Sequence, residues 1–405
     1  MKKFTKIISI LLVVAMAAVM FAACGKTESN TPADPKTNDT GAAPATDAPD
    51  APDAGKTVKI GVLVADVSGE EAQGFRSYYE NYIAKNYNVQ LLYTEQLQDA
   101  ASEKSAIEKF AAQGCEAIIS LSSSDRALQI QTCAENKLYY AVASGMLDDS
   151  QYEEFKTNEY FVGQIGPSMD TEYEAGYAMG KYFAESGAKT VAIYGAFIPN
   201  PMHVYHTAGV LAGIGATYGG TDVKDAVVGQ IFGDQGVDLS KVQANGVELV
   251  SYFQGYGDTT TDELNAAIQA APDAFISVGM ATTFFAQQLS TAGIKFGDID
   301  SFTGMNADSM ANGTLVYLAG KYSSSIGPIF AAVLDAVNGN LVRDGEGNAL
   351  SISQGYLVAT NSEEFDRYFT SDKGDSPIFS KAVLDAVISD TATYDDFVKL
   401  VQNNG

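Results

Sequence analysis

From residue 58 onward, short apolar runs alternate with stretches that have the periodicity of helices. The first run, 58–64, reads VKIGVLV, which is typical of a strand buried on both faces of a parallel sheet. We expect further strands at 89–93, 117–121 and 138–143, and helices at 70–85, 102–113 and 125–136. Alternation through short loops predicts a parallel sheet with right-handed crossovers.

The same pattern restarts after residue 170. We expect helices at 171–186, 203–216, 261–270, 282–292 and 326–338, and strands at 190–194, 247–252, 274–278, 300–303 and 315–319. A last strand at 351–359 and helices at 361–369 and 381–388 complete the pattern. Two such rounds predict an α/β protein made of two Rossmann-like, doubly wound lobes.

The composition excludes several classes of protein. There are 50 Asp and Glu against 25 Lys and Arg, a net charge of −25, which argues against binding to a nucleic acid backbone. Three Cys and two His are too few for a dense disulfide scaffold or a multi-histidine metal centre. The sequence carries no Ser-His-Asp order, nucleophile elbow or Walker loop. We therefore expect neither an enzyme nor a protein that needs a metal or cofactor.

The N-terminus resembles an export segment. Lysines precede an apolar run at 7–23 whose one polar residue is Ser9. That run is short for a membrane span of about 20 residues, so a secretory signal is favoured over a retained transmembrane anchor. Cys24 follows two alanines, which resembles the bacterial lipobox, although Phe21 stands where Leu is usual. The resemblance implies cleavage after residue 23, lipidation of Cys24 and anchoring outside the cell.

Residues 24–56 are rich in Ala, Pro, Asp, Thr and Gly and contain nothing that could form an apolar core. We expect a solvated tether there.

Several local patterns, in this order and spacing, resemble the type I periplasmic binding proteins. They are VKIGV at 58–62, CEAII at 115–119, EAGYAMG at 174–180, FTG at 302–304 and SIG at 325–327. That family supplies the solute-binding components of ABC importers, including the ribose- and galactose-binding proteins. The resemblance implies two lobes joined by a hinge, which close over a ligand and present the closed form to a membrane permease. We expect a monomer.

On this basis we divide the chain into two lobes. Residues 57–166 and 321–348 are expected to form the N-terminal lobe, and 167–320 and 349–405 the C-terminal lobe. Ligands of open α/β sheets bind beyond the carboxyl ends of the strands, so the site is expected in the loops between the lobes.

The expected ligand contacts of the first lobe are polar side chains and one aromatic ring. They are Asp66, Ser68, Gln73, Ser124, Asp125 and Ser144, with Phe75 as the ring. A place for Phe75 in the core is the alternative, and the one favoured for that residue.

In the second lobe, the stretch from Asn200 to His206 resembles the galactose-binding pattern, which implies that both residues face the ligand. Tyr256 falls near the family's stacking aromatic residue. Met280, Asn306 and Lys321 complete the expected set, at positions where family members carry other polar groups. Lys321 permits a ligand with a carboxylate or phosphate; a lysine that only snorkels at the hinge is the alternative.

The ligand expected from these patterns is a sugar or sugar derivative. A weaker resemblance, in 66–69 (DVSG) and 195–199 (GAFIP), is to the nucleoside-binding basic membrane lipoproteins, so a nucleoside is the alternative. A ligand sensor for a membrane receptor kinase is a rival of another class.

Two further pairs of residues have open alternatives. His203 and His206 could share a metal, but capping or hydrogen bonding is favoured. Cys115 and Cys133 are either free thiols, which we favour, or a bridge.

Overall fold

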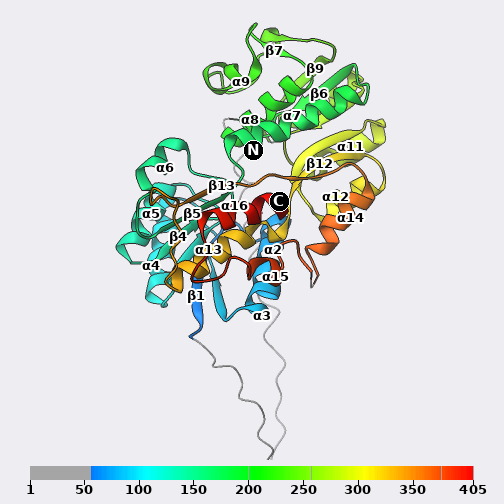
Figure 1. The fold of residues 1–405 in the computed structure, drawn as a ribbon. Helices are drawn as coiled ribbons and strands as arrows, with labels where there is room; N and C mark the ends of the chain where they lie inside the picture. Colours follow the sequence, from blue (N-terminus) through cyan, green and yellow to red (C-terminus); the bar gives the residue numbers. More distant parts are fainter. Residues whose placement is uncertain (1–55, 199, 257, 375, 405) are drawn as a thin grey trace, which may run out of the picture. The chain divides into compact units, whose positions relative to one another are not determined.

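The computed structural model describes residues 56–405, except 199, 257, 375 and 405 (Figure 1). The expected export segment, Cys24 and all of the tether before Lys56 lie outside the described residues. In the part that is described, no helix has both the length and the apolar character to cross a membrane.

The first sheet has six parallel strands in the order β13-β5-β4-β3-β1-β2. Its strands are β1 (Val58–Leu63), β2 (Val89–Tyr93), β3 (Ala117–Ser120), β4 (Tyr139–Val142), β5 (Phe161–Gly166) and β13 (Leu350–Ser353). The helices of this lobe are α2 (Glu70–Ser77), α3 (Ala84–Asn86), α4 (Ala100–Ala112), α5 (Arg126–Glu135), α6 (Asp149–Phe155) and α13 (Gly327–Val337). A π-helical turn, Tyr78–Ile83, joins α2 to α3. Every residue of β3 and β5 is buried, as expected of parallel strands with both faces covered.

The second sheet has the order β14-β12-β11-β10-β6-β9, and only its edge strand β14 runs antiparallel. Its strands are β6 (Thr190–Tyr194), β9 (Glu248–Phe253), β10 (Ala274–Ser277), β11 (Phe296–Ser301), β12 (Leu315–Lys321) and β14 (Leu357–Ala359). Its helices are α7 (Met169–Glu185), α8 (Pro201–Gly213), α10 (Asp258–Gln269), α11 (Ala281–Ala292), α12 (Gly304–Ala311) and α14 (Ser362–Ser371). Two doubly wound lobes confirm the expected fold class.

A small insertion separates α8 from β9. It pairs β7 (Thr217–Tyr218) with β8 (Val242–Gln243) and contains α9 (Val223–Ala226), a π-helical turn at Val227–Phe232 and a 3₁₀ turn at Leu239–Lys241.

The chain passes between the two sheets three times. The crossovers run from β5 to α7, from β12 through a 3₁₀ turn (Ser323–Ile326) to α13, and from β13 to β14. The single strand expected at 351–359 is therefore two strands in two different sheets. The local pattern did not show this, because the two strands are close together in the sequence and differ in their pairing partners, which lie far away.

The C-terminal segment also differs from the expected division. Only β14 and α14 of residues 349–405 join the second sheet, whereas β13 joins the first. Helices α15 (Lys381–Leu384) and α16 (Tyr394–Asn404) pack against α13, beside the first sheet (Figure 1). Burial of Leu384 and Phe397, both fully inaccessible, holds this segment in place.

The cysteines Cys115 and Cys133 are both buried and free, as favoured from the sequence.

Candidate functional site

Two cavities lie where the carboxyl ends of the strands and the crossovers meet. The larger, about 1050 Å³, is bounded by loops after β3 and β4 and by the first turns of α7 and α8. The smaller, about 390 Å³, lies between α2 of the first lobe and the β11–α12 and β12 ends of the second. Both cavities therefore have walls from both lobes.

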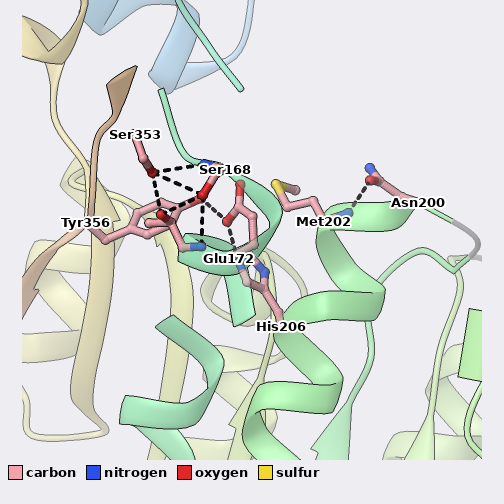
Figure 2. Close-up of polar contacts among 8 residues, drawn as sticks. Ser168, Glu172, Asn200, Met202, His206, Ser353 and Tyr356 are labelled. Carbon is pink, nitrogen blue, oxygen red and sulfur yellow. Dashed lines mark hydrogen bonds and ion pairs between the residues drawn. The ribbon is translucent and has the colours of Figure 1, made fainter. Parts of the chain in front are cut away.

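The larger cavity contains three of the expected contacts, Ser124, Asp125 and Asn200. Two of them also cap helices: Asp125 accepts a hydrogen bond from the Leu128 N–H at 3.0 Å, and Asn200 accepts one from the Met202 N–H at 3.1 Å (Figure 2). Such caps satisfy backbone donors that a helix end leaves free. Their side chains are thus held in fixed positions at the cavity wall.

Gln73, Phe75 and Lys321 line the smaller cavity. Phe75 is only 4% exposed, so most of its ring packs in the core, as favoured for it, while its remaining surface lines the cavity. Two carboxylates of α2 also make hydrogen bonds across this cavity, and neither is among the expected ligand contacts. Glu70 accepts a hydrogen bond from the Gly304 N–H at 3.2 Å, and the Glu71 carboxylate accepts one from the Ser301 hydroxyl.

The charge of Lys321 acts on two buried carboxyls. Burial raises the pKa of Asp300 to about 6, the charge of Glu71 acts in the same direction, and Lys321 opposes them. Lys321 also helps to lower the pKa of Glu172.

Three exposed aromatic rings cluster at the carboxyl edge of the second sheet. Phe197 follows β6, Tyr256 follows β9 and Phe284 lies in the first turn of α11, after β10. The rings of Phe197 and Tyr256 are stacked with centroids 6.2 Å apart, and Tyr256 and Phe284 are 5.4 Å apart. Their exposed fractions are 48%, 47% and 41%. We refer to Phe197, Tyr256 and Phe284 as the aromatic platform.

The platform rests on a rigid base. Tyr194 contacts Tyr256 edge-on, and Phe285 packs beneath Phe284. The Tyr194 hydroxyl donates to the Gly255 carbonyl at 3.0 Å, which fixes the loop that carries Tyr256. Burial raises the pKa of Tyr194, so this hydroxyl remains a donor at neutral pH.

Two non-glycine residues in the left-handed region stand beside the platform. Ala196 has φ of 51° and Met280 has φ of 66°. Such strain is often found at binding sites, where the surrounding structure maintains it. Met280 is also 40% exposed, but it lines neither of the two cavities.

His206 does not face a cavity, contrary to expectation. It is 1% exposed, and its Nε2 donates to Glu172 at 2.6 Å (Figure 2). Tyr356, from the β13–β14 crossover, donates to the same carboxylate at 2.6 Å. Burial by itself raises the pKa of Glu172, but the charge and hydrogen bond of His206, the charge of Lys321 and the hydrogen bond of Tyr356 together make the net shift downward. His206, which stands where the galactose-binding pattern has an arginine that binds the ligand, is therefore part of a buried contact between α7, α8 and the β13–β14 crossover.

Asn306 is likewise buried, at 1% exposure, and its amide donates to the Ser301 carbonyl at 2.7 Å. Ser144 lies in a small space between the crossovers, where its carbonyl accepts from Arg126 at 2.9 Å. Asp66 and Ser68 are largely exposed and hydrogen-bond to each other, and neither lines a cavity described above.

The paired histidines have protein partners of their own. Burial lowers the pKa of His203 to about 4, and its Nδ1 lies 2.9 Å from the Phe197 carbonyl. In the described part of the chain, no three His, Cys, Asp or Glu side chains are grouped to hold a metal.

Phe197 and Phe284 were missed from the sequence. Phe197 lies in the Gly- and Pro-containing loop after β6, which was expected to carry site residues, so an aromatic residue there was a usable indication. Phe284 lies inside a helical pattern, where a ring is more often core.

No protein-family model matches this chain, and no curated protein matches it. Solved structures do. The periplasmic component of an arabinose ABC transporter from Shewanella sp. ANA-3 aligns with a TM-score of 0.55 at 16% identity, over 78% of this chain and 96% of that one. An ABC transporter solute-binding protein from Actinobacillus succinogenes 130z with bound D-allose aligns with a TM-score of 0.56 at 14% identity, over 77% and 100%.

A third structure, a TorS sensor domain–TorT complex, aligns with a TM-score of 0.50 at 14% identity, over 69% of this chain and 86% of that one. At these identities the likeness defines the fold. The chain has the two-lobed fold of the type I periplasmic binding proteins.

Proposed function

We propose that the protein is the solute-binding component of an ABC importer, held on the outer face of the cell membrane by a lipid on Cys24. It captures a sugar or sugar derivative between its lobes and delivers it to a permease. The observation that carries this proposal is the aromatic platform, a solvent-exposed set of rings at the edge of the sheet where this fold offers its loops.

The chemistry of the two walls suits such a ligand. Aromatic rings pack on the apolar C–H faces of a sugar, and hydroxyls hydrogen-bond to amide, hydroxyl and carboxylate groups. We assign the ring contacts to the platform and to Phe75. We assign the polar contacts to Gln73 and Lys321 in the smaller cavity and to Ser124, Asp125 and Asn200 in the larger one. Met280 is assigned to the site with the platform, since it is exposed and precedes the helix that carries Phe284.

Binding requires no covalent step. A ligand that contacts both lobes stabilises the closed arrangement by its differential affinity for that state. The solved structures with this fold described above, which are named as binding proteins, are consistent with this role.

A thermal-shift screen of neutral sugars, sugar acids and nucleosides tests the proposal. A ligand at 100 times its Kd raises the free energy of unfolding by about 2.7 kcal/mol. Tyr256→Ala should abolish the ligand-induced shift while leaving the unliganded melting temperature nearly unchanged, because the ring is 47% exposed. Tyr177→Ala, which removes an exposed ring on α7, is the matched control and should keep the shift.

A shift by nucleosides and by no sugar would contradict the sugar assignment and support the nucleoside alternative. A large loss of unliganded stability in Tyr256→Ala would mean that the ring is a core residue. Cys24→Ser should release the protein from the membrane fraction; retention in membranes would contradict the lipid anchor.

A role as ligand sensor for a membrane receptor kinase is the second candidate, and the likeness to a complex that contains a sensor domain favours a sensor role. Cross-linking of the ligand-loaded protein in intact cells distinguishes the two, since the captured partner is either a permease or a kinase.

A further inference from the structure

We propose that the connection between α14 and α15, residues 372–380, links the two lobes and limits how far they open, so that the affinity for ligand depends on it. We refer to residues 372–380 as the C-terminal strap; residue 375 lies outside the described residues. The part of the inference that concerns affinity rests on the proposed function, whereas the effect on lobe motion is measured without any ligand.

The two ends of the strap belong to different lobes. Before it, α14 packs against α12 and β14 of the second lobe (Figure 1), and the fully buried ring of Phe365 lies 5.1 Å from that of Phe302, centroid to centroid. After it, α15 packs against α13 of the first lobe, where Leu384 is fully buried. Within the described residues, the strap therefore adds a fourth link to the three crossovers between the sheets.

The strap runs beside the second crossover, which leads from β12 to α13. At its start, Asp372 accepts hydrogen bonds from the N–H of Ser324, at 2.6 Å, and from the hydroxyl of the same residue. Near its end, the N–H of Phe379 donates to the Ser324 hydroxyl at 3.4 Å, and the Phe379 ring stacks on Tyr322 with centroids 6.3 Å apart. Rotation at this crossover must therefore carry the strap along or break these contacts.

Breaking the contacts is costly because the groups involved are buried. Asp372 is 7% exposed and Ser324 is fully buried. A buried carboxyl or hydroxyl that loses its partner keeps the full penalty of leaving water. The strap should therefore stay attached to the crossover and restrict its rotation.

Hydrogen bonds from one helical segment hold the end of the strap on the first lobe. The Tyr78 hydroxyl donates to the Phe379 carbonyl at 2.6 Å, and the Tyr82 hydroxyl accepts from the Lys381 N–H at 2.8 Å. Tyr78 and Tyr82 both lie in the π-helical turn that follows α2, and their rings are stacked 5.8 Å apart. The strap is thus fixed at both ends and along its side.

The strap also forms part of the wall of the smaller cavity. Asp372 and Lys373 line this cavity together with Phe369 of α14 and Gln73 of α2. Among the described residues, none from the strap lines the larger cavity. A ligand in the smaller cavity would therefore contact both lobes and the strap.

A limit on lobe opening raises affinity through the populations of the free protein. For a ligand that binds the closed arrangement, the apparent Kd equals the intrinsic Kd divided by the fraction of free protein that is closed. A link that excludes widely open arrangements raises this fraction, and a longer link lowers it. Lengthening the strap should therefore weaken binding although the groups that contact the ligand remain.

The test lengthens the strap and keeps its anchors. Gly-Ser-Gly-Ser is inserted between Lys373 and Gly374, which are both exposed, in the full chain. The insertion should cost little stability, because the free energy of closing a loop rises only slowly with its length. Spin labels on one exposed helix of each lobe, measured without ligand, should then report a broader distribution that extends to longer distances.

The same variant measures the effect on affinity. The probe is the sugar or nucleoside that gives the largest thermal shift with the wild-type protein. We expect its Kd to rise about threefold or more, because the closed fraction falls. As the matched control, the same four residues are inserted between Ala244 and Asn245, in the exposed loop between β8 and β9, and should change neither the distances nor the Kd.

A second variant leaves the length of the chain unchanged. Tyr78→Phe keeps the ring and removes the hydrogen bond to the Phe379 carbonyl. It should broaden the distance distribution in the same direction by a smaller amount. If the insertion lowers the melting temperature far below that of its control, Tyr78→Phe tests the strap in its place.

Equal distance distributions for the wild type, the strap insertion and Tyr78→Phe would overturn the inference, and so would the same broadening in the control insertion. A broader distribution with an unchanged Kd would overturn the link to affinity. Failure of every probe to bind would count against the proposed function and leave the distance measurement as the test of the strap.

Discussion

At the scale of single residues, several buried carboxyls near the crossovers are held in an environment that disfavours their charge. Asp372, at the end of α14, accepts a hydrogen bond from the Ser324 N–H at 2.6 Å and another from the Ser324 hydroxyl. Burial nevertheless raises its pKa to about 6. Because Ser324 lies in the crossover that leads to α13, this contact joins the second lobe to the entry of the first.

The raised pKa of Asp372 makes stability depend on pH. Its unfolded pKa is 3.8, so the folded state binds the proton more tightly, and the gain is complete below pH 3.8 and is lost as pH rises through 6. Between pH 7 and pH 4 this group should add about 2 kcal/mol to the free energy of unfolding. In denaturant titrations, Asp372→Asn should show a smaller rise on acidification than wild type, whereas the exposed Asp262→Asn should match wild type. Parallel curves for wild type and Asp372→Asn would refute this.

At the scale of helices and strands, the close packing of α7 against α8 depends on glycine residues. Each helix carries two glycines four residues apart, Gly176 and Gly180 on α7 and Gly209 and Gly213 on α8. A Cβ placed on Gly176 would lie 2.1 Å from the His206 carbonyl oxygen. The glycines therefore let the two backbones approach more closely than any side chain would permit.

Gly176→Ala should accordingly push the helices apart and lower the free energy of unfolding by about 3 kcal/mol. Thermal and denaturant melts measure the loss. Gly229→Ala, in the insertion, is the matched control, since no described heavy atom lies within 4 Å of its added Cβ, and it should be neutral or slightly stabilising. Equal stability of Gly176→Ala and wild type would show that the helices can separate without cost.

At the scale of the whole molecule, hydrogen bonds hold the third crossover in place on both sides of Gly355. The Gln354 backbone N–H donates to the carbonyl of Gly166, the last residue of β5, at 3.0 Å, and the Tyr356 hydroxyl donates to Glu172 on α7. Gly355 stands between them, and no described heavy atom lies within 4 Å of a Cβ added there. We infer that, when the lobes rotate, the backbone dihedral angles of this crossover change at Gly355.

Tyr356→Phe removes the hydrogen bond to the buried carboxylate, so the crossover should lose its fixed attachment to the second lobe. Spin labels placed on one exposed helix of each lobe should report a broader distance distribution, and the free energy of unfolding should fall by about 2 kcal/mol. Tyr394→Phe, which removes a bond to the Ser351 carbonyl within the first lobe, is the control. Identical distributions for Tyr356→Phe and wild type would contradict the hinge assignment.

The candidate site was predictable only in part. Loop positions could be inferred because ligands of parallel sheets bind at the carboxyl edge, and residues such as Ser124, Asn200 and Lys321 do line cavities. His206 could not be placed, because its burial depends on Glu172 and Tyr356, which are 34 and 150 positions away. The stacking of Phe197 on Tyr256 likewise joins loops that follow different strands.

The order of residues alone determined the alternation of strands and helices, the two rounds of α/β structure and the expectation of a two-lobed binding fold, because burial periodicity is a local property. Only the tertiary structure decided that β13 and α16 belong with the first lobe, that a histidine supports the hinge, and that three rings form one surface. These depend on which distant segments meet, and hydrophobic patterning along a segment is the same whichever partner it packs against.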